Sequence, residues 1–181
     1  TYTYSDANGC VGTATNTISV TSGVAVTLAS FSPICANSSS IVLTGGSPTG
    51  GTYSGTGVSG TTFNPTTSGE GTFAITYSYT NANGCVSSAQ SSMVVNAVTA
   101  VTLSSTTPVC NNTSSFTLTG GTPSGGTYSG TGVSSNNFFP SVAGVGTTTI
   151  TYTYTNAQGC ASTATANQVV NAAPTVTLGS F

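Results

Sequence analysis

Hydrophobic and polar residues alternate along this chain in short runs, and each run ends at a glycine-rich segment. The longest run spans residues 72–80. Its odd-numbered positions are large and apolar, namely Phe73, Ile75, Tyr77 and Tyr79, and the polar residues Thr76 and Ser78 lie between the last three. Successive side chains of a β-strand point to opposite faces, so this period of two predicts a strand with one buried face. The pattern predicts an all-β fold.

Reading residues 23–97 in this way gives about seven short strands separated by turns, a number typical of an immunoglobulin-like β-sandwich. The last two strands form a hairpin closed by Asn-Ala-Asn-Gly, in which Gly84 suits a left-handed backbone position. Six of these strands can be placed, near residues 24–29, 40–44, 52–54, 61–64, 72–80 and 86–95.

The whole pattern repeats every 75 residues without a gap. TYTYSDANGC at 1–10 returns as TYSYTNANGC at 76–85 and as TYTYTNAQGC at 151–160. LTGGSPTGGTYSGTGVSG at 43–60 returns as LTGGTPSGGTYSGTGVSS at 118–135. A unit of this length is too long for one solenoid coil and suits a small sandwich domain.

The repeat predicts the domain organisation. Residues 23–97 and 98–172 are two complete modules, residues 1–22 match the C-terminal hairpin of a preceding repeat, and residues 173–181 match the first strand of a following one. We therefore expect the sequence to be a segment of a longer tandem array. The short links between modules favour a stiff rod.

Composition narrows the function. The 181 residues include no Lys, Arg or His and only two acids, while Ser and Thr exceed a third of the chain. Without basic residues nothing neutralises phosphate, which excludes nucleic acid and anionic membrane surfaces as partners. No apolar run approaches the length of a membrane-spanning helix, so we expect no membrane insertion.

The same composition argues against an enzyme. Without histidine the usual general bases of nucleophilic catalysis are missing. Asp6 becomes Asn81 and Asn156 in the sister repeats, and Glu70 becomes Val145, so neither acid is predicted to be a site. Too few acids and evenly spaced cysteines predict no metal site and no cofactor.

The repeated motifs resemble those of a known class of protein. The order P-x-C, LTGG-x-P-x-GGTYSGTGV, F-x-P, ITYTYT-x-A-x-GC is similar to the immunoglobulin-like repeats of giant surface proteins of Bacteroidota, including gliding-motility adhesins of the SprB type. The resemblance covers both full repeats and both partial ones. It implies type IX secretion and display at the cell surface as a filament or adhesin.

The five cysteines are predicted to form disulfides, as expected outside the cell. The preferred pairing is within repeats, Cys35–Cys85 and Cys110–Cys160, closing 50-residue loops. The alternative is a bond between modules, Cys35–Cys160, because in an immunoglobulin topology the first corner and the last hairpin lie at opposite ends of the sandwich. Cys10 is expected to pair with a cysteine outside the given sequence.

Two functions follow. The first is structural: the shaft of a secreted surface filament or giant adhesin serving attachment or gliding, with neighbouring repeats as partners and lateral self-association into a filament. The second is binding, in which modules recognise a surface glycan by many weak sites. Tyr53 and Tyr128, each near glycines, are the candidate exposed contact aromatics.

Overall fold

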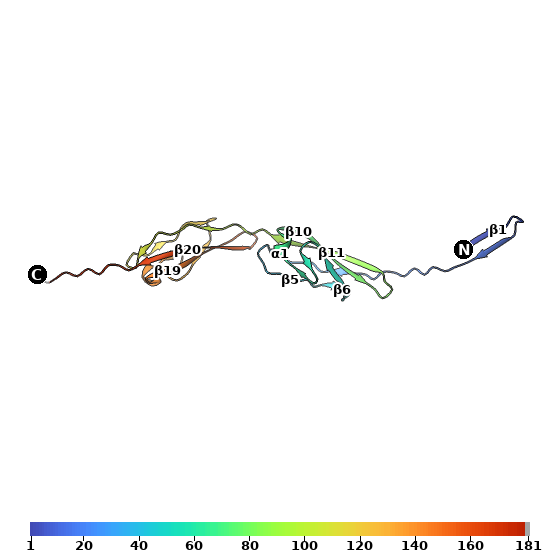
Figure 1. The fold of residues 1–181 in the computed structure, drawn as a ribbon, viewed down its shortest axis with the longest axis horizontal. Coiled ribbons are helices and arrows are strands. Elements are labelled where there is room, and N and C mark those ends of the chain that lie inside the picture. Colours follow the sequence, from blue (N-terminus) through green and yellow to red (C-terminus); the bar gives the residue numbers. More distant parts are fainter. Residues whose placement is uncertain (180–181) are drawn as a thin grey trace.

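The computed structural model describes residues 1–179, and their regular secondary structure is almost entirely β-strand. The described part of the molecule is elongated, with two sandwich-like modules end to end and the N-terminal hairpin at the opposite end from residue 179 (Figure 1). The all-β prediction is confirmed.

The first module contains nine strands and one four-residue helix. Their bounds are β3 (Thr27–Leu28), β4 (Ile34–Cys35), β5 (Ile41–Val42), β6 (Gly46–Ser47), β7 (Thr52–Ser54), β8 (Val58–Ser59), β9 (Thr62–Phe63), α1 (Pro65–Ser68), β10 (Gly71–Thr80) and β11 (Val86–Asn96).

The second module repeats this order of elements. Its strands and helix are β12 (Thr102–Leu103), β13 (Val109–Cys110), β14 (Phe116–Thr117), β15 (Gly121–Thr122), β16 (Thr127–Ser129), β17 (Val133–Ser134), β18 (Asn137–Phe138), α2 (Pro140–Ala143), β19 (Gly146–Thr155) and β20 (Ala161–Asn171). Each begins 75 positions after its counterpart.

Each module has one larger and two smaller sheets. In the first, the larger sheet has the order β4-β11-β10-β7, with β4 parallel to β11 and the other pairs antiparallel. The smaller sheets are β5-β9-β8 and β3-β6. In the larger sheet, β7 lies beside β10, and β10 lies beside β11, the last strand of the module. A middle strand next to the last hairpin is typical of an immunoglobulin-type sandwich.

In each module, apolar side chains from the larger sheet and from the smaller sheets meet in one core. The first core consists of Leu43, Phe63, Ile75, Met93 and Val95, and the second of Leu118, Phe138, Ile150 and Val170. In β10 the expected face is turned inward: Ile75 and Tyr77 are buried, while Phe73 and Tyr79 are half-buried at its rim.

The strands that the sequence pattern missed are all two residues long. Strands β4, β6 and β8 contain too few residues to show alternation, and the expected strand at 24–29 is reduced to β3. The helix α1 begins at Pro65, and the side chain of Asn64 accepts hydrogen bonds from the first helical amides.

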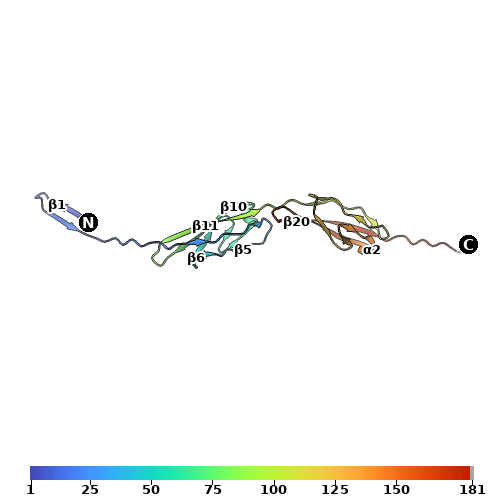
Figure 2. The same cartoon turned by 180° about the vertical axis from the view of Figure 1, so that it is seen from behind.

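Residues 1–22 form a separate hairpin, β1 (Tyr2–Ser5) with β2 (Val11–Ala14), and an extended segment (Figure 2). Tyr2 is 69% exposed, whereas its repeat equivalents Tyr77 and Tyr152 are 2% and 1% exposed. A second sheet covers the tyrosine in each complete module and none covers it here. Among residues 1–179, no helix is long and apolar enough to cross a membrane.

Candidate functional site

The feature that joins distant parts of the chain is a disulfide between the two modules. Cys35, at the end of β4, is bonded to Cys160, which directly precedes β20. Their Cα atoms are 5.6 Å apart, within the range of an ordinary disulfide. Cys160 is 1% exposed, so the bond is sheltered on the side of the second module.

The preferred within-repeat pairing is wrong, because Cys35 is bonded to Cys160 and neither Cys35–Cys85 nor Cys110–Cys160 can form alongside that bond. The reason is the length of β11. Cys35 lies beside Asn96 at the end of this strand, and Cys85 directly precedes its start. Eleven residues at about 3.3 Å each separate the two cysteines by roughly 35 Å, far beyond disulfide reach.

Local structure presents each cysteine to the other module. The parallel pairing of Asn96 with Cys35 holds Cys35 at the end where the chain leaves the first module. On the other side, the Asn156 side-chain oxygen accepts hydrogen bonds from the Gln158 and Cys160 amides, at 3.1 and 2.9 Å. This bonding orders the hairpin that carries Cys160.

Two further hydrogen bonds cross the joint, in opposite directions. The Asn37 side-chain amide of the first module donates to the Ala161 carbonyl at 2.9 Å, and the Asn156 amide of the second donates to the Ala97 carbonyl at 2.9 Å. Together with the disulfide and the linking chain, they give the joint four separate ties. A joint tied at several points resists bending more than a linker alone.

The residues that make the joint recur at the end of the second module that lies away from the first module. Cys110, Asn112 and Ala172 occupy the positions of Cys35, Asn37 and Ala97. Cys110 is exposed and free within the described residues. That end therefore carries the same set of groups, and within residues 1–179 no module lies against it.

The corresponding hairpin of the first module also keeps its joint residues, Asn81 and Cys85. The Cys85 sulfur, free in the described chain, is 3.4 Å from the Thr21 hydroxyl. Thr21 is the repeat equivalent of Asn96, the residue paired with Cys35. The preceding segment thus approaches Cys85 much as the first module's last strand approaches Cys160.

The candidate contact aromatics are not exposed. Tyr53 is half-buried, its ring centroid is 4.8 Å from that of Tyr77, and its hydroxyl accepts a hydrogen bond from the Gly46 amide at 3.1 Å. Tyr128 makes the equivalent contacts, with Tyr152 and with Gly121. The prediction of exposure was wrong because glycines let the backbone fold down onto these rings rather than leave them in solvent.

The Asp6 side chain takes part in the hydrogen bonding of its own hairpin. The Asp6 carboxylate accepts hydrogen bonds from the Asn8 and Cys10 amides, as the amide oxygen of Asn156 does in its own hairpin. Within residues 1–179 no group of three or more His, Cys, Asp or Glu side chains is placed to hold a metal ion. The pairing of Cys10 stays a prediction, since its thiol is exposed and free in the described chain.

Comparison with known proteins gives distant likenesses only. No protein-family model and no curated protein matches the chain. One similar solved structure is a Ca²⁺-stabilized adhesin that helps an Antarctic bacterium bind ice, at 16% identity and a TM-score of 0.33 over 74% of this chain and 43% of that one.

Another is the SGBP-B protein of the mixed-linkage glucan utilization locus of Bacteroides ovatus, in complex with a mixed-linkage heptasaccharide. It is 19% identical with a TM-score of 0.29, over 84% of this chain and 45% of that one. The chain spans less than half the length of either protein. At these TM-scores neither likeness carries an argument about function, and the resemblance to gliding-motility adhesins is not confirmed.

Proposed function

We propose that this chain is a load-bearing segment of the shaft of a secreted surface filament or giant adhesin. The observation that carries the proposal is the Cys35–Cys160 bond between the modules. A disulfide between consecutive modules would add little to independent binding domains on flexible linkers. In a fibre under tension, the same bond keeps neighbouring modules covalently joined.

The bond changes the path of a pulling force. Cys35 and Cys160 are 125 positions apart, so most of both modules lies inside the closed loop. Tension applied at the two ends of the chain passes from Cys35 directly to Cys160. The core strands β10 and β19 lie within the loop and cannot be pulled out to their full length.

Repetition extends this device along an array. Cys110 and Asn112 present to a following module what Cys35 and Asn37 present to the second one. If each joint is closed in the same way, successive disulfide loops overlap and the shaft is covalently tied at every junction. Neighbouring repeats are then the main partners of each module.

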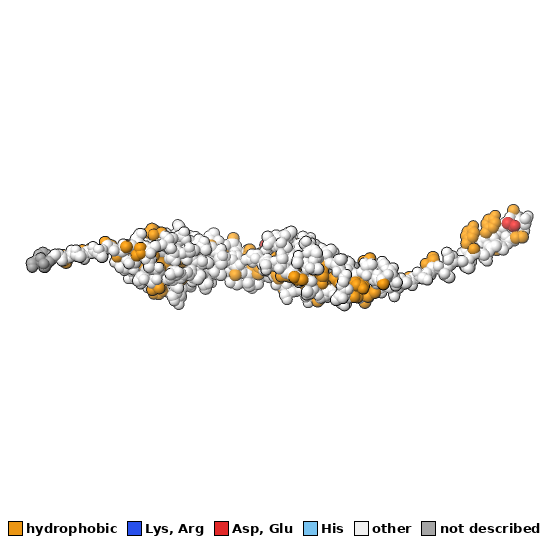
Figure 3. Space-filling view, turned by 60° about the horizontal axis from the view of Figure 1, so that its bottom comes forward, with side chains coloured by type: hydrophobic (Ala, Val, Ile, Leu, Met, Phe, Trp, Pro, Cys, Tyr) orange, Lys and Arg blue, Asp and Glu red, His pale blue; other side chains and the backbone are white. Residues whose placement is uncertain are grey.

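The composition fits an exposed fibre. Disulfides persist in oxidising compartments, which favours an extracellular location. The surface is almost uncharged, as the space-filling view shows (Figure 3), so its solubility depends on Ser and Thr hydroxyls and little on salt. We assign no catalytic role to these modules.

Single-molecule stretching tests the proposal. The chain is held by handles at its two ends and extended to full length, first oxidised and then after reduction. We expect reduction to add about 410–450 Å of contour length, since each of the roughly 125 released residues spans about 3.3–3.6 Å when extended.

A Cys35→Ser, Cys160→Ser double variant is the matched control and should show the longer contour without reductant. An unchanged contour on reduction would mean that force does not pass through the bond, and the load-bearing role would then be wrong.

A further inference from the structure

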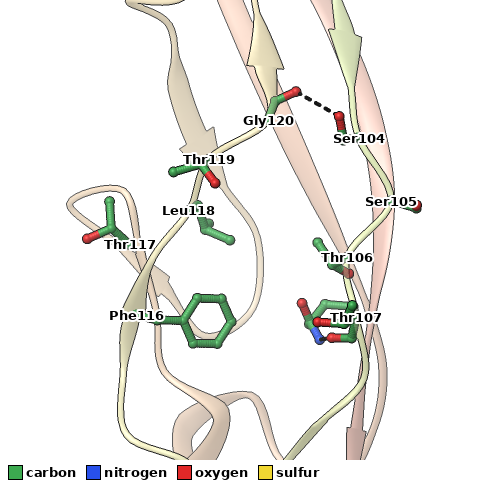
Figure 4. A pocket seen from close by; sticks show the side chains of 10 residues that line it. Ser104, Ser105, Thr106, Thr107, Phe116, Thr117, Leu118, Thr119 and Gly120 are labelled. Carbon is green, nitrogen blue, oxygen red and sulfur yellow. Dashed lines mark hydrogen bonds between the residues drawn. The ribbon is translucent and has the colours of Figure 1, made fainter.

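The second module contains a cavity of about 260 Å³ between the segment 104–107 and residues 116–120. Figure 4 shows Phe116 and Leu118 pointing into it from one wall and Thr106 from the other. A hydrogen bond between the Ser104 hydroxyl and the Gly120 carbonyl spans one end.

The cavity is lined by residues that differ between the sister modules. Thr106 stands where the first module has Phe31, and Gln168 stands where it has Met93. Phe31 packs against the first core, and Met93 is fully buried in it. Replacing the Phe31 ring by the small Thr106 side chain leaves space in the second module that the first module fills.

Gln168 lines this cavity, is 0% exposed, and has a buried oxygen without a partner. Its amide nitrogen donates to the Thr107 and Val169 carbonyls, at 2.8 and 3.1 Å. Both neighbours are acceptors, so the nitrogen must lie on their side and the oxygen on the other. No donor in the described structure reaches this Oε1. A buried acceptor left unpaired destabilises a fold, and a methionine at this position would avoid that cost.

The lining fixes the chemistry of a ligand. It combines hydroxyls, backbone groups, the Phe116 ring and the Gln168 amide, and it contains no charged side chain. An ion would find no counter-charge there. A neutral ligand with hydroxyl donors and an apolar face matches the polarity of this lining, and the volume lies just below the range of about 300–1,000 Å³ usual for drug-sized ligands.

We propose that this cavity binds a single neutral sugar residue of a glycan, with the sugar ring lying against Phe116. Because Oε1 of Gln168 is buried in the empty cavity, binding includes a small shift of this side chain that lets a sugar hydroxyl donate to Oε1. The site belongs to the second module and is closed in the first by Phe31 and Met93. It is independent of the shaft proposal, because the cavity shares no residue with the joint.

Nuclear magnetic resonance on the ¹⁵N-labelled chain tests this. The probes are the methyl glycosides of glucose, galactose, mannose and N-acetylglucosamine, titrated to high millimolar concentration. We expect at least one to give saturable shifts at the Gln168 side-chain amide and the Gly120 backbone amide, with no change at the first-module equivalent Gly45.

The sister module supplies matched controls. Thr106→Phe and Gln168→Met place the residues of the first module in the second, so we expect both variants to fold and to weaken binding at least tenfold. The reverse pair, Phe31→Thr with Met93→Gln, should bring glycoside shifts to the first module.

Three results would overturn the proposal: no saturable shift with any of the four glycosides, equal shifts in the Thr106→Phe variant, or a bound water as the sole partner of Gln168 that no glycoside displaces. A failure here leaves the stretching result of the shaft proposal untouched.

Discussion

Removing the hydroxyl of Tyr77 should destabilise the first module strongly for so small a change. The ring is 2% exposed, and its hydroxyl makes two hydrogen bonds to one loop. It donates to the Pro48 carbonyl at 2.6 Å and accepts from the Gly51 amide at 2.7 Å. These bonds tie the loop between β6 and β7 to the core strand β10.

The magnitude follows from those two bonds. Each contributes about 1 kcal/mol net, so Tyr77→Phe should lower the free energy of unfolding by about 2 kcal/mol. For a module of this size, 1 kcal/mol corresponds to about 4–8 °C. We therefore expect the first module to melt roughly 8–16 °C lower, while the second module, which keeps Tyr152, is unchanged.

Methyl signals of Ile75 and Ile150 follow the two modules separately during thermal unfolding, since each residue lies in one core. Tyr79→Phe is the control, because this half-buried tyrosine lies on the same strand and the described residues offer its hydroxyl no hydrogen bond. If Tyr77→Phe and Tyr79→Phe shift the Ile75 transition equally, the hydroxyl does not hold the loop and the reasoning fails.

Three other substitutions have clear expected outcomes. Gly51→Ala should cost the first module more than about 2 kcal/mol, because the new methyl group would lie within 2.5–2.7 Å of the Tyr77 side chain; a melting curve checks this. Asn156→Ala should loosen the joint, and Asn81→Ala only its own hairpin, so only the former should raise the rate at which a reductant cleaves the disulfide. Gln168→Met should change the free energy of unfolding of the second module by less than about 1 kcal/mol in the absence of ligand, measured by urea unfolding, because removing the unpaired oxygen offsets the loss of the two hydrogen bonds that Nε2 donates.

Much of the fold could be predicted from the sequence because its longest strands carry long alternating patterns. The expected strand at 72–80 corresponds to β10, and that at 86–95 to β11. The sister repeats have Asn81 and Asn156 at the position of Asp6, which argued against an acid site there, and the Asp6 carboxylate accepts amide hydrogen bonds within its hairpin. Two-residue strands such as β4 carry no such pattern.

The cysteine partners could not be predicted from spacing alone. Closing a 125-residue loop costs only about 0.8 kcal/mol more than closing a 50-residue loop, so chain entropy does not choose between Cys160 and Cys85. The choice is made by the position of Cys35 at the far end of β11 from Cys85. That position depends on β4, a strand the pattern did not predict.

The cavity was missed for a related reason. The repeat already shows Phe31 replaced by Thr106, but its consequence requires knowing that this position faces the core. The expected exposure of Tyr53 failed likewise, because glycine-rich flanks permit a close approach of backbone to ring as readily as they permit exposure.

The central claim, that consecutive modules are covalently joined, is tested most directly by mapping the disulfide. Free thiols are blocked first, and the unreduced chain is cut with chymotrypsin, since it offers trypsin no Lys or Arg. Mass spectrometry should then find one linked pair of peptides containing Cys35 and Cys160, with Cys110 blocked. A peptide linking Cys35 to Cys85, or Cys35 found blocked, would contradict the account.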